Sequence, residues 1–295
     1  MRQEHFEFEV GGDRVVGNLH LPSGTPKGAV VTTGPLTSVK EQAAGIYARA
    51  MAERGYAALA FDHRSFGESD GQPRQFENPE GKAEDIGHAV SALLAHPATG
   101  GLPVFAVGVC AGGGYMALAV ARDPRIRAFA GVAGVYPDVE QTRAWMGENY
   151  QPAIDRALSA ERRWRETGVS ETIAAVAPDN GDVAMPLAEA FEYYGTTRGS
   201  VSNYVNGFAV QSRAYTLPFD VQHIAGDIHV PTVLIHSERA LMPALAHRFF
   251  AALSVDKQEL WLQSQGQIDF YDDPRLIKPA ADAIDRFFNR ESGRK

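Results

Sequence analysis

The amino-acid sequence predicts an α/β fold with a mostly parallel sheet and helices on both of its faces. Five short segments are almost entirely apolar, as strands buried on both faces are: 28–33, 56–61, 103–109, 127–134 and 230–237. Helical segments lie between them, and this alternation is typical of parallel sheets. The 295 residues, 44% of them hydrophobic, are enough for one large core with an insertion.

The remaining elements follow from local patterns. Residues 5–10 and 13–22 alternate apolar and polar positions around a pair of glycines, which predicts an antiparallel hairpin at the edge of the sheet. Gly55 ends a predicted helix, and Pro79 stands near the first turn of the next one. Helices are expected over 40–55, 79–96, 111–123 and 274–290, and a final strand over 257–262.

The alternation is interrupted between about residues 139 and 226, where helix and loop patterns replace buried strands. This predicts a helical cap inserted between two parts of the core, 1–138 and 227–295, above the carboxyl ends of the strands. Four aromatic residues are candidates for contacting a substrate there, the alternative being ordinary packing: Trp145, Tyr193, Tyr194 and Tyr204.

Charge and cysteine content narrow the class of function. The net charge is −8 and no basic segment is present, which argues against nucleic acid or an anionic membrane and favours a small-molecule substrate. A single cysteine cannot form an internal disulfide, as is typical of a reducing compartment. With no apolar leader and no bilayer-spanning segment, the sequence predicts a cytoplasmic chain, without cofactor or metal. A homodimer stays open.

The segment GVCAGGGY, residues 108–115, lies where a buried strand meets a helix. A sharp turn of the form G-x-nucleophile-x-G needs small neighbours, because it brings strand and helix close together. The helix N-terminus is expected to favour the thiolate of Cys110 and to lower its pKa. Cys110 is therefore predicted to be a nucleophile; the alternative is a buried cysteine that acts as a small hydrophobic residue.

This motif, together with residues 34–86, HSE at 236–238 and IDFYDD at 268–273, resembles the α/β-hydrolase superfamily over nearly the whole chain. In particular it resembles the branch of dienelactone hydrolases and polyketide transferases that carries cysteine at the elbow. The resemblance implies the α/β-hydrolase fold and a catalytic acid at Glu238. It also implies an oxyanion hole formed by the N–H of Ala111 and that of Leu36 or Thr37.

The sequence departs from the family's pattern at Gln267, which stands where the resemblance places the catalytic histidine. A glutamine amide can orient a substrate or a water molecule but cannot take up a proton near neutral pH. His63, just beyond a predicted strand, is a candidate substitute base, although a structural role is favoured. A serine at the elbow would be nearly inert here, whereas cysteine is partly thiolate at pH 7.

These observations predict an enzyme that attacks an ester, lactone or thioester of a small apolar or polyketide-like molecule. Acylation of the thiol can proceed, whereas hydrolysis of the acyl intermediate suffers because water needs a base. A non-hydrolytic cyclase, acyltransferase or isomerase is therefore an alternative, and so is a binding protein that has lost catalysis. If Gln267 were an introduced substitution, an ordinary Cys-Glu-His enzyme would be the natural form.

Overall fold

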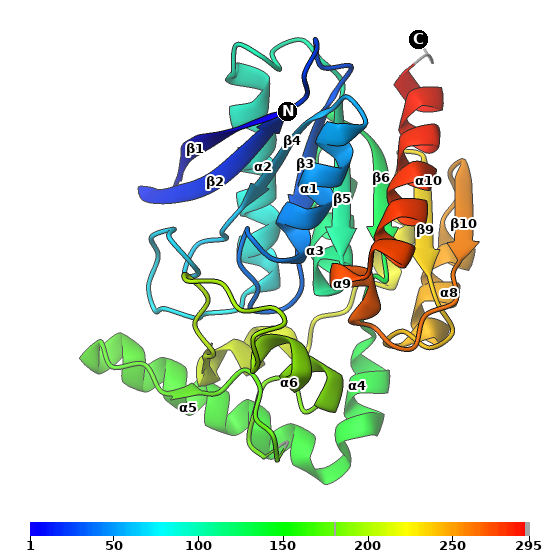
Figure 1. Cartoon of the computed structure of the whole chain (residues 1–295). Coiled ribbons are helices and arrows are strands. Elements are labelled where there is room, and N and C mark those ends of the chain that lie inside the picture. The colour runs from blue at the N-terminus through cyan, green and yellow to red at the C-terminus, as the bar shows by residue number, and fades with distance from the viewer. Residues whose placement is uncertain (180, 293–295) are drawn as a thin grey trace.

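A computed structural model describes residues 1–179 and 181–292 (Figure 1). One eight-stranded sheet has the order β1-β2-β4-β3-β5-β6-β9-β10. Strand β2 pairs antiparallel with both β1 and β4, and all other neighbours are parallel. The strands are β1 (Arg2–Val10), β2 (Asp13–Leu21), β3 (Ala29–Thr33), β4 (Ala57–Phe61), β5 (Val104–Val109), β6 (Ile126–Val132), β9 (Thr232–His236) and β10 (Lys257–Trp261).

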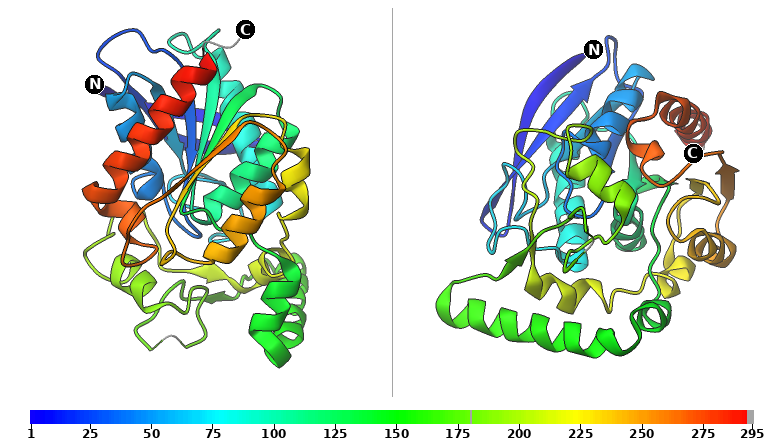
Figure 2. Two further views of the ribbon diagram at one scale, coloured as in Figure 1. Left: turned by 90° about the vertical axis from the view of Figure 1, so that its right-hand side faces the viewer. Right: turned by 60° about the horizontal axis from the view of Figure 1, so that its bottom comes forward.

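Helices cover both faces of this sheet (Figures 1 and 2). One hydrophobic core contains α1 (Ala43–Glu53) and α10 (Pro274–Ser292). The other contains α2 (Pro79–Ala95), α3 (Ala111–Arg122) and α8 (Pro243–Ala252). Strands β3, β4, β5 and β9 are buried along their whole length, which explains why both faces of these strands are so apolar.

The segment between β6 and β9 forms the insertion. It contains α4 (Val139–Met146), α5 (Tyr150–Thr167), α6 (Ala188–Tyr194) and α7 (Arg213–Thr216), and a two-stranded antiparallel sheet of β7 (Thr172–Ile173) and β8 (Phe208–Ala209). The carboxyl ends of the parallel strands point toward it, with α6 closer to the sheet than α5 (Figure 1). The sequence patterns indicate only helices and loops here, because two-residue strands are too short to show alternation.

Two boundaries differ from the expected ones for a local reason. The helix expected from residue 40 begins at Ala43, because the backbone N–H of Lys40 donates to Asp62 Oδ1 (2.7 Å) and that of Val39 donates to Gln42 Oε1 (3.1 Å). A short helix, α9 (Asp269–Asp272), precedes α10. Among the described residues no helix combines the length and the hydropathy that a membrane span requires.

Candidate active site

Cys110 occupies a strained turn between β5 and α3. Its φ of 57° and ψ of −126° lie in a region that residues with a side chain rarely adopt. Its N–H donates to the Val132 carbonyl (3.1 Å), and its own carbonyl accepts from Gly113 and Val135 (2.8 Å each). These bonds fix the turn from both sides, and the residue is only 8% exposed.

The glycines around Cys110 are required by close backbone contacts. A Cβ atom on Gly112 would lie 2.6 Å from the carbonyl oxygen of Gly34 and 2.7 Å from that of Thr33. A Cβ atom on Gly108 would collide with the Gly112 carbonyl. The turn therefore presses directly against the residues that precede the loop after β3, as the small-residue pattern predicts.

Hydrogen-bond donors surround the sulfur. Burial raises the pKa of the Cys110 thiol, while the Tyr271 hydroxyl, the Ala111 N–H, the Gln267 side chain and the Leu36 N–H act to lower it. The net direction corrects the expectation of a lowered pKa, because the loss of solvation outweighs the helix N-terminus. Two of these donors, the N–H groups of Ala111 and Leu36, are residues that the resemblance assigns to an oxyanion hole.

Thr37, the alternative second donor, has a different partner. Its N–H donates to Glu77 Oε2 (3.1 Å), and its φ of 61° is unusual for a residue with a side chain. Glu77 is fully buried; its Oε1 accepts from the Tyr115 hydroxyl (2.8 Å) and pairs with Lys82 Nζ (2.5 Å). The buried Glu77–Lys82 pair thus holds the loop in the conformation that directs the Leu36 N–H toward the sulfur.

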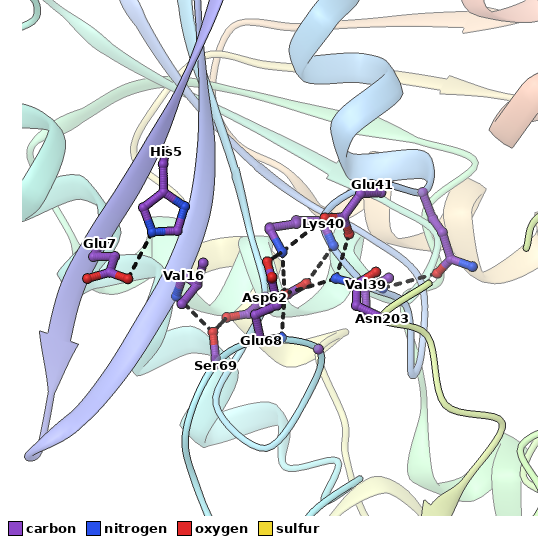
Figure 3. Close-up of polar contacts among 12 residues, drawn as sticks. His5, Glu7, Val16, Val39, Lys40, Glu41, Asp62, Glu68, Ser69 and Asn203 are labelled. Atoms are coloured by element: carbon purple, nitrogen blue, oxygen red, sulfur yellow. Dashed lines mark hydrogen bonds and ion pairs between the residues drawn. The ribbon is translucent and has the colours of Figure 1, made fainter. Parts of the chain in front are cut away.

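A second buried charge cluster fixes the end of the same loop (Figure 3). The Lys40 ammonium, 1% exposed, contacts Asp62 Oδ2 (2.8 Å), Glu41 Oε1 (3.0 Å) and Glu68. Burial opposes the charge of Lys40, but Asp62 raises its pKa, so it stays protonated. Asn203 of the insertion donates to Glu41 Oε2 (2.8 Å), which joins the insertion to the loop.

The start of the loop is held by His63. Its Nε2 is 2.8 Å from Thr33 Oγ1, and its Nδ1 is 3.1 Å from Asp85 Oδ2. Burial lowers the pKa of His63, so the ring is neutral. Both ring nitrogens of His63 are engaged, one by Thr33 and one by Asp85. His63 thus anchors the loop, which agrees with the structural role favoured from the sequence.

Gln267 is bonded into the protein through every polar atom of its side chain. Its Oε1 accepts from the Leu241 N–H (2.8 Å), and its Nε2 donates to the Ala133 carbonyl (2.8 Å) and lies 3.4 Å from the Tyr271 hydroxyl. The side chain ties the ends of β6, β9 and β10 together beside Cys110. It is close to the thiol, as its assigned position implies, but its amide is already engaged.

Glu238 lies apart from this arrangement. Its side chain is 70% exposed, and its carboxylate is 3.0 Å from Nε2 of His247, whose ring stacks on Trp261 at 3.9 Å. Where a catalytic histidine would donate to the acid, Gln267 instead accepts a backbone N–H. The structure therefore does not join Glu238 and Gln267 into a relay, because a glutamine oxygen attracts a donor and not a carboxylate.

The aromatic candidates separate into two groups. Tyr193 and Tyr194 are buried on α6, and Tyr194 packs against Tyr204 with ring centroids 5.3 Å apart. Tyr193 also contacts Tyr271 at 5.5 Å. Trp145 is 66% exposed on α4, a helix without buried residues, so the structure does not bring it together with the buried tyrosines.

Three residues important for this geometry are not evident from the sequence. Tyr271 is an aromatic residue in an apolar context, and its only signal is its position four residues after Gln267. Glu77 gives no signal, because its partners lie on other segments. Glu189 on α6 accepts the N–H of Gln267 (3.0 Å) and of Ile268 (3.4 Å), which attaches the insertion to the same corner.

The arrangement places a thiol among hydrogen-bond donors, and in the described part of the chain no histidine or carboxylate is among the groups that contact the sulfur. Burial, and then the charge of Cys110, raise the pKa of Tyr271 well above its usual range, so this hydroxyl stays protonated. Donors at the sulfur suit an attacking thiolate and the oxyanion that its attack creates. Within the described residues, no group of three or more His, Cys, Asp or Glu side chains is arranged to hold a metal ion.

Comparisons with known proteins agree with this architecture. The uncharacterised protein PA2218 of Pseudomonas aeruginosa is 32% identical over 295 residues, covering 94% of this chain and 77% of the relative. Its crystal structure superposes with a TM-score of 0.85 at 28% identity, over 98% of this chain and 94% of the other.

More distant relatives have named activities. The polyketide transferase GrgF of a Penicillium species is 25% identical over 187 residues, 63% of this chain and 62% of the relative. Its crystal structure matches with a TM-score of 0.81 at 21% identity, over 98% of this chain and 100% of the other. A dienelactone hydrolase of Anabaena variabilis shares the fold, with a TM-score of 0.60 at 15% identity over 98% and 97% of the two chains.

The family described as serine aminopeptidase, S33, matches residues 25–173, which include the elbow and the loop after β3. The family's description names serine, whereas this chain carries cysteine at the elbow. Sheet order, elbow and relatives together identify the chain as an α/β-hydrolase-fold protein that belongs to the serine aminopeptidase S33 family.

Proposed function

We propose that this chain is a cysteine-dependent acyl-transfer enzyme that takes an acyl group from a small ester, lactone or thioester onto Cys110. The observation that carries the proposal is the strained elbow, whose sulfur faces the N–H groups of Ala111 and Leu36. Two such donors stabilise a carbonyl oxygen as it becomes negative in the transition state. Membership of a hydrolase family and a polyketide transferase among the relatives support the same chemistry.

In the first step, the Cys110 thiolate attacks the carbonyl carbon of the donor. A bond forms between carbon and Sγ, the bond to the leaving group breaks, and the leaving group takes up a proton from solvent, replacing the one that the thiol released. A thioester is the donor that suits this site best, because a leaving thiolate departs without help from an acid. An alkoxide leaving group would need a proton, and the Tyr271 hydroxyl at the sulfur is a weak acid, because burial raises its pKa well above the usual range.

In the second step, an acceptor attacks the thioester carbon, the carbon–sulfur bond breaks, and the departing Cys110 thiolate takes up the proton that the acceptor loses. Water is a poor acceptor here, because Gln267 cannot remove its proton and its amide is engaged by Leu241 and Ala133. A hydroxyl or amine on the acyl chain itself, or on a bound acceptor, reacts faster through proximity. Transfer or cyclisation is therefore favoured over hydrolysis.

A binding protein that has lost catalysis explains the elbow less well. Backbone strain of the kind seen at Cys110 destabilises a fold and persists where function requires it. A protein that only binds would need neither that strain nor N–H groups directed at the sulfur.

Intact-mass measurement of the full chain, incubated with an acyl thioester of N-acetylcysteamine, tests the proposal. We expect a one-acyl adduct that forms within minutes, persists in buffer and disappears when a small amine or thiol acceptor is added. The Cys110→Ala variant, which keeps the fold, should form no adduct.

Two outcomes would contradict the proposal. An adduct equally abundant in Cys110→Ala would place the acyl group elsewhere, and the absence of both adduct and turnover would remove the enzyme assignment. Fast hydrolysis without accumulation would overturn the transfer step, because it requires a base at the site.

A further inference from the structure

Eight side chains among the described residues bury a polar atom that has no hydrogen-bond partner, and three of them gather beside the nucleophile. These three are the hydroxyls of Thr37, Tyr194 and Tyr204, here called the hydroxyl cluster. The other five are Tyr47, Tyr136, Asn203, Gln211 and Ser264. Thr37 and Tyr194 are themselves more than nine-tenths buried.

The hydroxyl cluster is continuous with the donor side of Cys110. Thr37 directly follows Leu36, whose N–H faces the sulfur. The Thr37 hydroxyl acts as a donor that lowers the pKa of Tyr204, so it is the Tyr204 proton that lacks an acceptor, and the Tyr204 ring packs on Tyr194. The cluster therefore lies between the loop after β3 and the insertion, next to the residue whose N–H faces the sulfur.

The charge state of Tyr194 makes it a donor. Burial, followed by the charges of Tyr193 and Cys110, raises the pKa of Tyr194 well above its usual range. A protonated hydroxyl without a partner is costly when it is buried, and such groups in native proteins normally have a partner. Because this one lies within electrostatic reach of the thiol, the missing partner belongs where the substrate binds.

We propose that the hydroxyl cluster is an acyl-binding subsite, and that the acyl group accepted by Cys110 carries a hydroxyl or keto oxygen a few bonds from its reacting carbonyl. The inference rests on the proposed function, since Cys110 must take up an acyl group. A saturated acyl chain would cover the cluster and leave the protons of Tyr194 and Tyr204 without an acceptor. An oxygenated chain would supply acceptors for Tyr194 and Tyr204 and an acceptor or donor for Thr37.

Two thioesters of N-acetylcysteamine provide the test: octanoyl, and its counterpart with a hydroxyl on the β-carbon. The rate of adduct formation on Cys110 of the full chain is followed by intact mass. We expect the oxygenated donor to react at least about tenfold faster, which corresponds to about 1.4 kcal/mol. Tyr194→Phe, Tyr204→Phe and Thr37→Val should each reduce this ratio by slowing the oxygenated donor alone.

Tyr136→Phe is the matched control. Its hydroxyl is also buried and unpartnered, but it packs against Gly131 and Gly134, and its ring stacks on Phe249 at 4.2 Å in the other core. This variant should keep the wild-type ratio.

Equal rates for the two donors in the wild-type chain would overturn the inference while leaving Cys110 acylation intact. An unchanged ratio in all three cluster variants would overturn it as well, because water alone would then satisfy the hydroxyls. If neither donor forms an adduct, the proposed function fails and this inference fails with it.

Discussion

Two sides of the Cys110 site are built on different principles. On one side, the segment of residues 33–42 is held at three points by buried polar groups: Thr33 by His63, Thr37 by Glu77 and Lys40 by Asp62. On the other side, Glu238 is exposed to solvent, and the side chain of Gln267 is engaged by backbone groups. The donor side is rigidly supported, whereas the acid–base side contains no relay.

The difference favours acylation of Cys110 over activation of water. Support by several buried charges costs solvation free energy and is worthwhile only where the position of a group matters. That support converges on the loop that carries the Leu36 N–H, the group proposed to stabilise an oxyanion. Water activation needs a base with a partner carboxylate, whereas Gln267 is not a base and the Glu238 carboxylate is paired with His247. Substitutions made on one side at a time test this difference.

The largest effect is expected from Cys110→Ser. A hydroxyl of high pKa needs a general base, which is worth about 10²–10⁴-fold, and this site has none in contact with the nucleophile. Acylation by an N-acetylcysteamine thioester should fall by at least about 10²-fold, as measured by intact mass, with an unchanged circular dichroism spectrum. A serine variant that retained one tenth of the rate would reveal a working base.

Glu77→Gln should lower the free energy of unfolding, because Glu77 supports the loop that carries the Leu36 N–H. It leaves Lys82 buried without its ion-pair partner, and breaking such a pair costs about 3–5 kcal/mol. Urea denaturation measures the free energy of unfolding, and Glu77→Gln with Lys82→Met should recover part of the loss. Glu80→Gln, which breaks an exposed pair with Arg122, is the control and should cost less than about 1 kcal/mol. Equal losses for both would refute the special role of buried support.

Tyr271→Phe tests the donors at the sulfur. This hydroxyl acts to lower the pKa of Cys110, so its removal should raise that pKa further. Iodoacetamide alkylation depends on the thiolate, so its rate should rise with pH past the ordinary thiol pKa of about 8.5. The variant should show this rise at higher pH, with a rate near neutrality about 2–10-fold lower.

Tyr56→Phe is the control for that measurement. Its hydroxyl bonds Asn289 at the far end of α10, so its alkylation profile should match the wild type. A Tyr271→Phe profile that coincides with the wild type would show that the hydroxyl does not influence the sulfur.

Gln267→His should restore little hydrolysis. In the variant, the ring nitrogen that replaces Oε1 must accept from the Leu241 N–H. The proton then sits on the other ring nitrogen, on the side of the Ala133 carbonyl, so this nitrogen cannot act as a base. Decay of the acyl adduct in buffer should accelerate by less than about tenfold, against the roughly 10²–10⁴-fold that a working base supplies. A hundredfold acceleration would mean that the acid–base side lacks only one residue.

The smallest effect is expected from Glu238→Ala. Its exposed pair with His247 contributes little to stability, and its carboxylate contacts neither Gln267 nor Cys110. The acylation rate should stay within about twofold of the wild type, since no hydrogen bond at the sulfur is lost. A tenfold loss of acylation rate would mean that Glu238 takes part in catalysis.

The sheet and the elbow could be predicted because their signals are local. Buried parallel strands are apolar throughout, and a tight turn needs the glycines next to Cys110. The prediction that the pKa of Cys110 is lowered was wrong: burial raises it, and the burial of Cys110 depends on how the insertion packs. Tyr271 and Glu77 gain their importance only from residues distant in the sequence. Glu238 pairs with His247 for the same reason: the orientation of its loop is set by tertiary contacts.

The chain has one sulfhydryl, and it is the proposed nucleophile. A chromogenic disulfide titrant therefore counts competent sites directly, without a background from other thiols. Peroxide can oxidise only one cysteine, so the loss of activity should be proportional to the loss of free thiol. A fluorophore or spin label placed on that sulfur reports from the centre of the site without any prior cysteine removal.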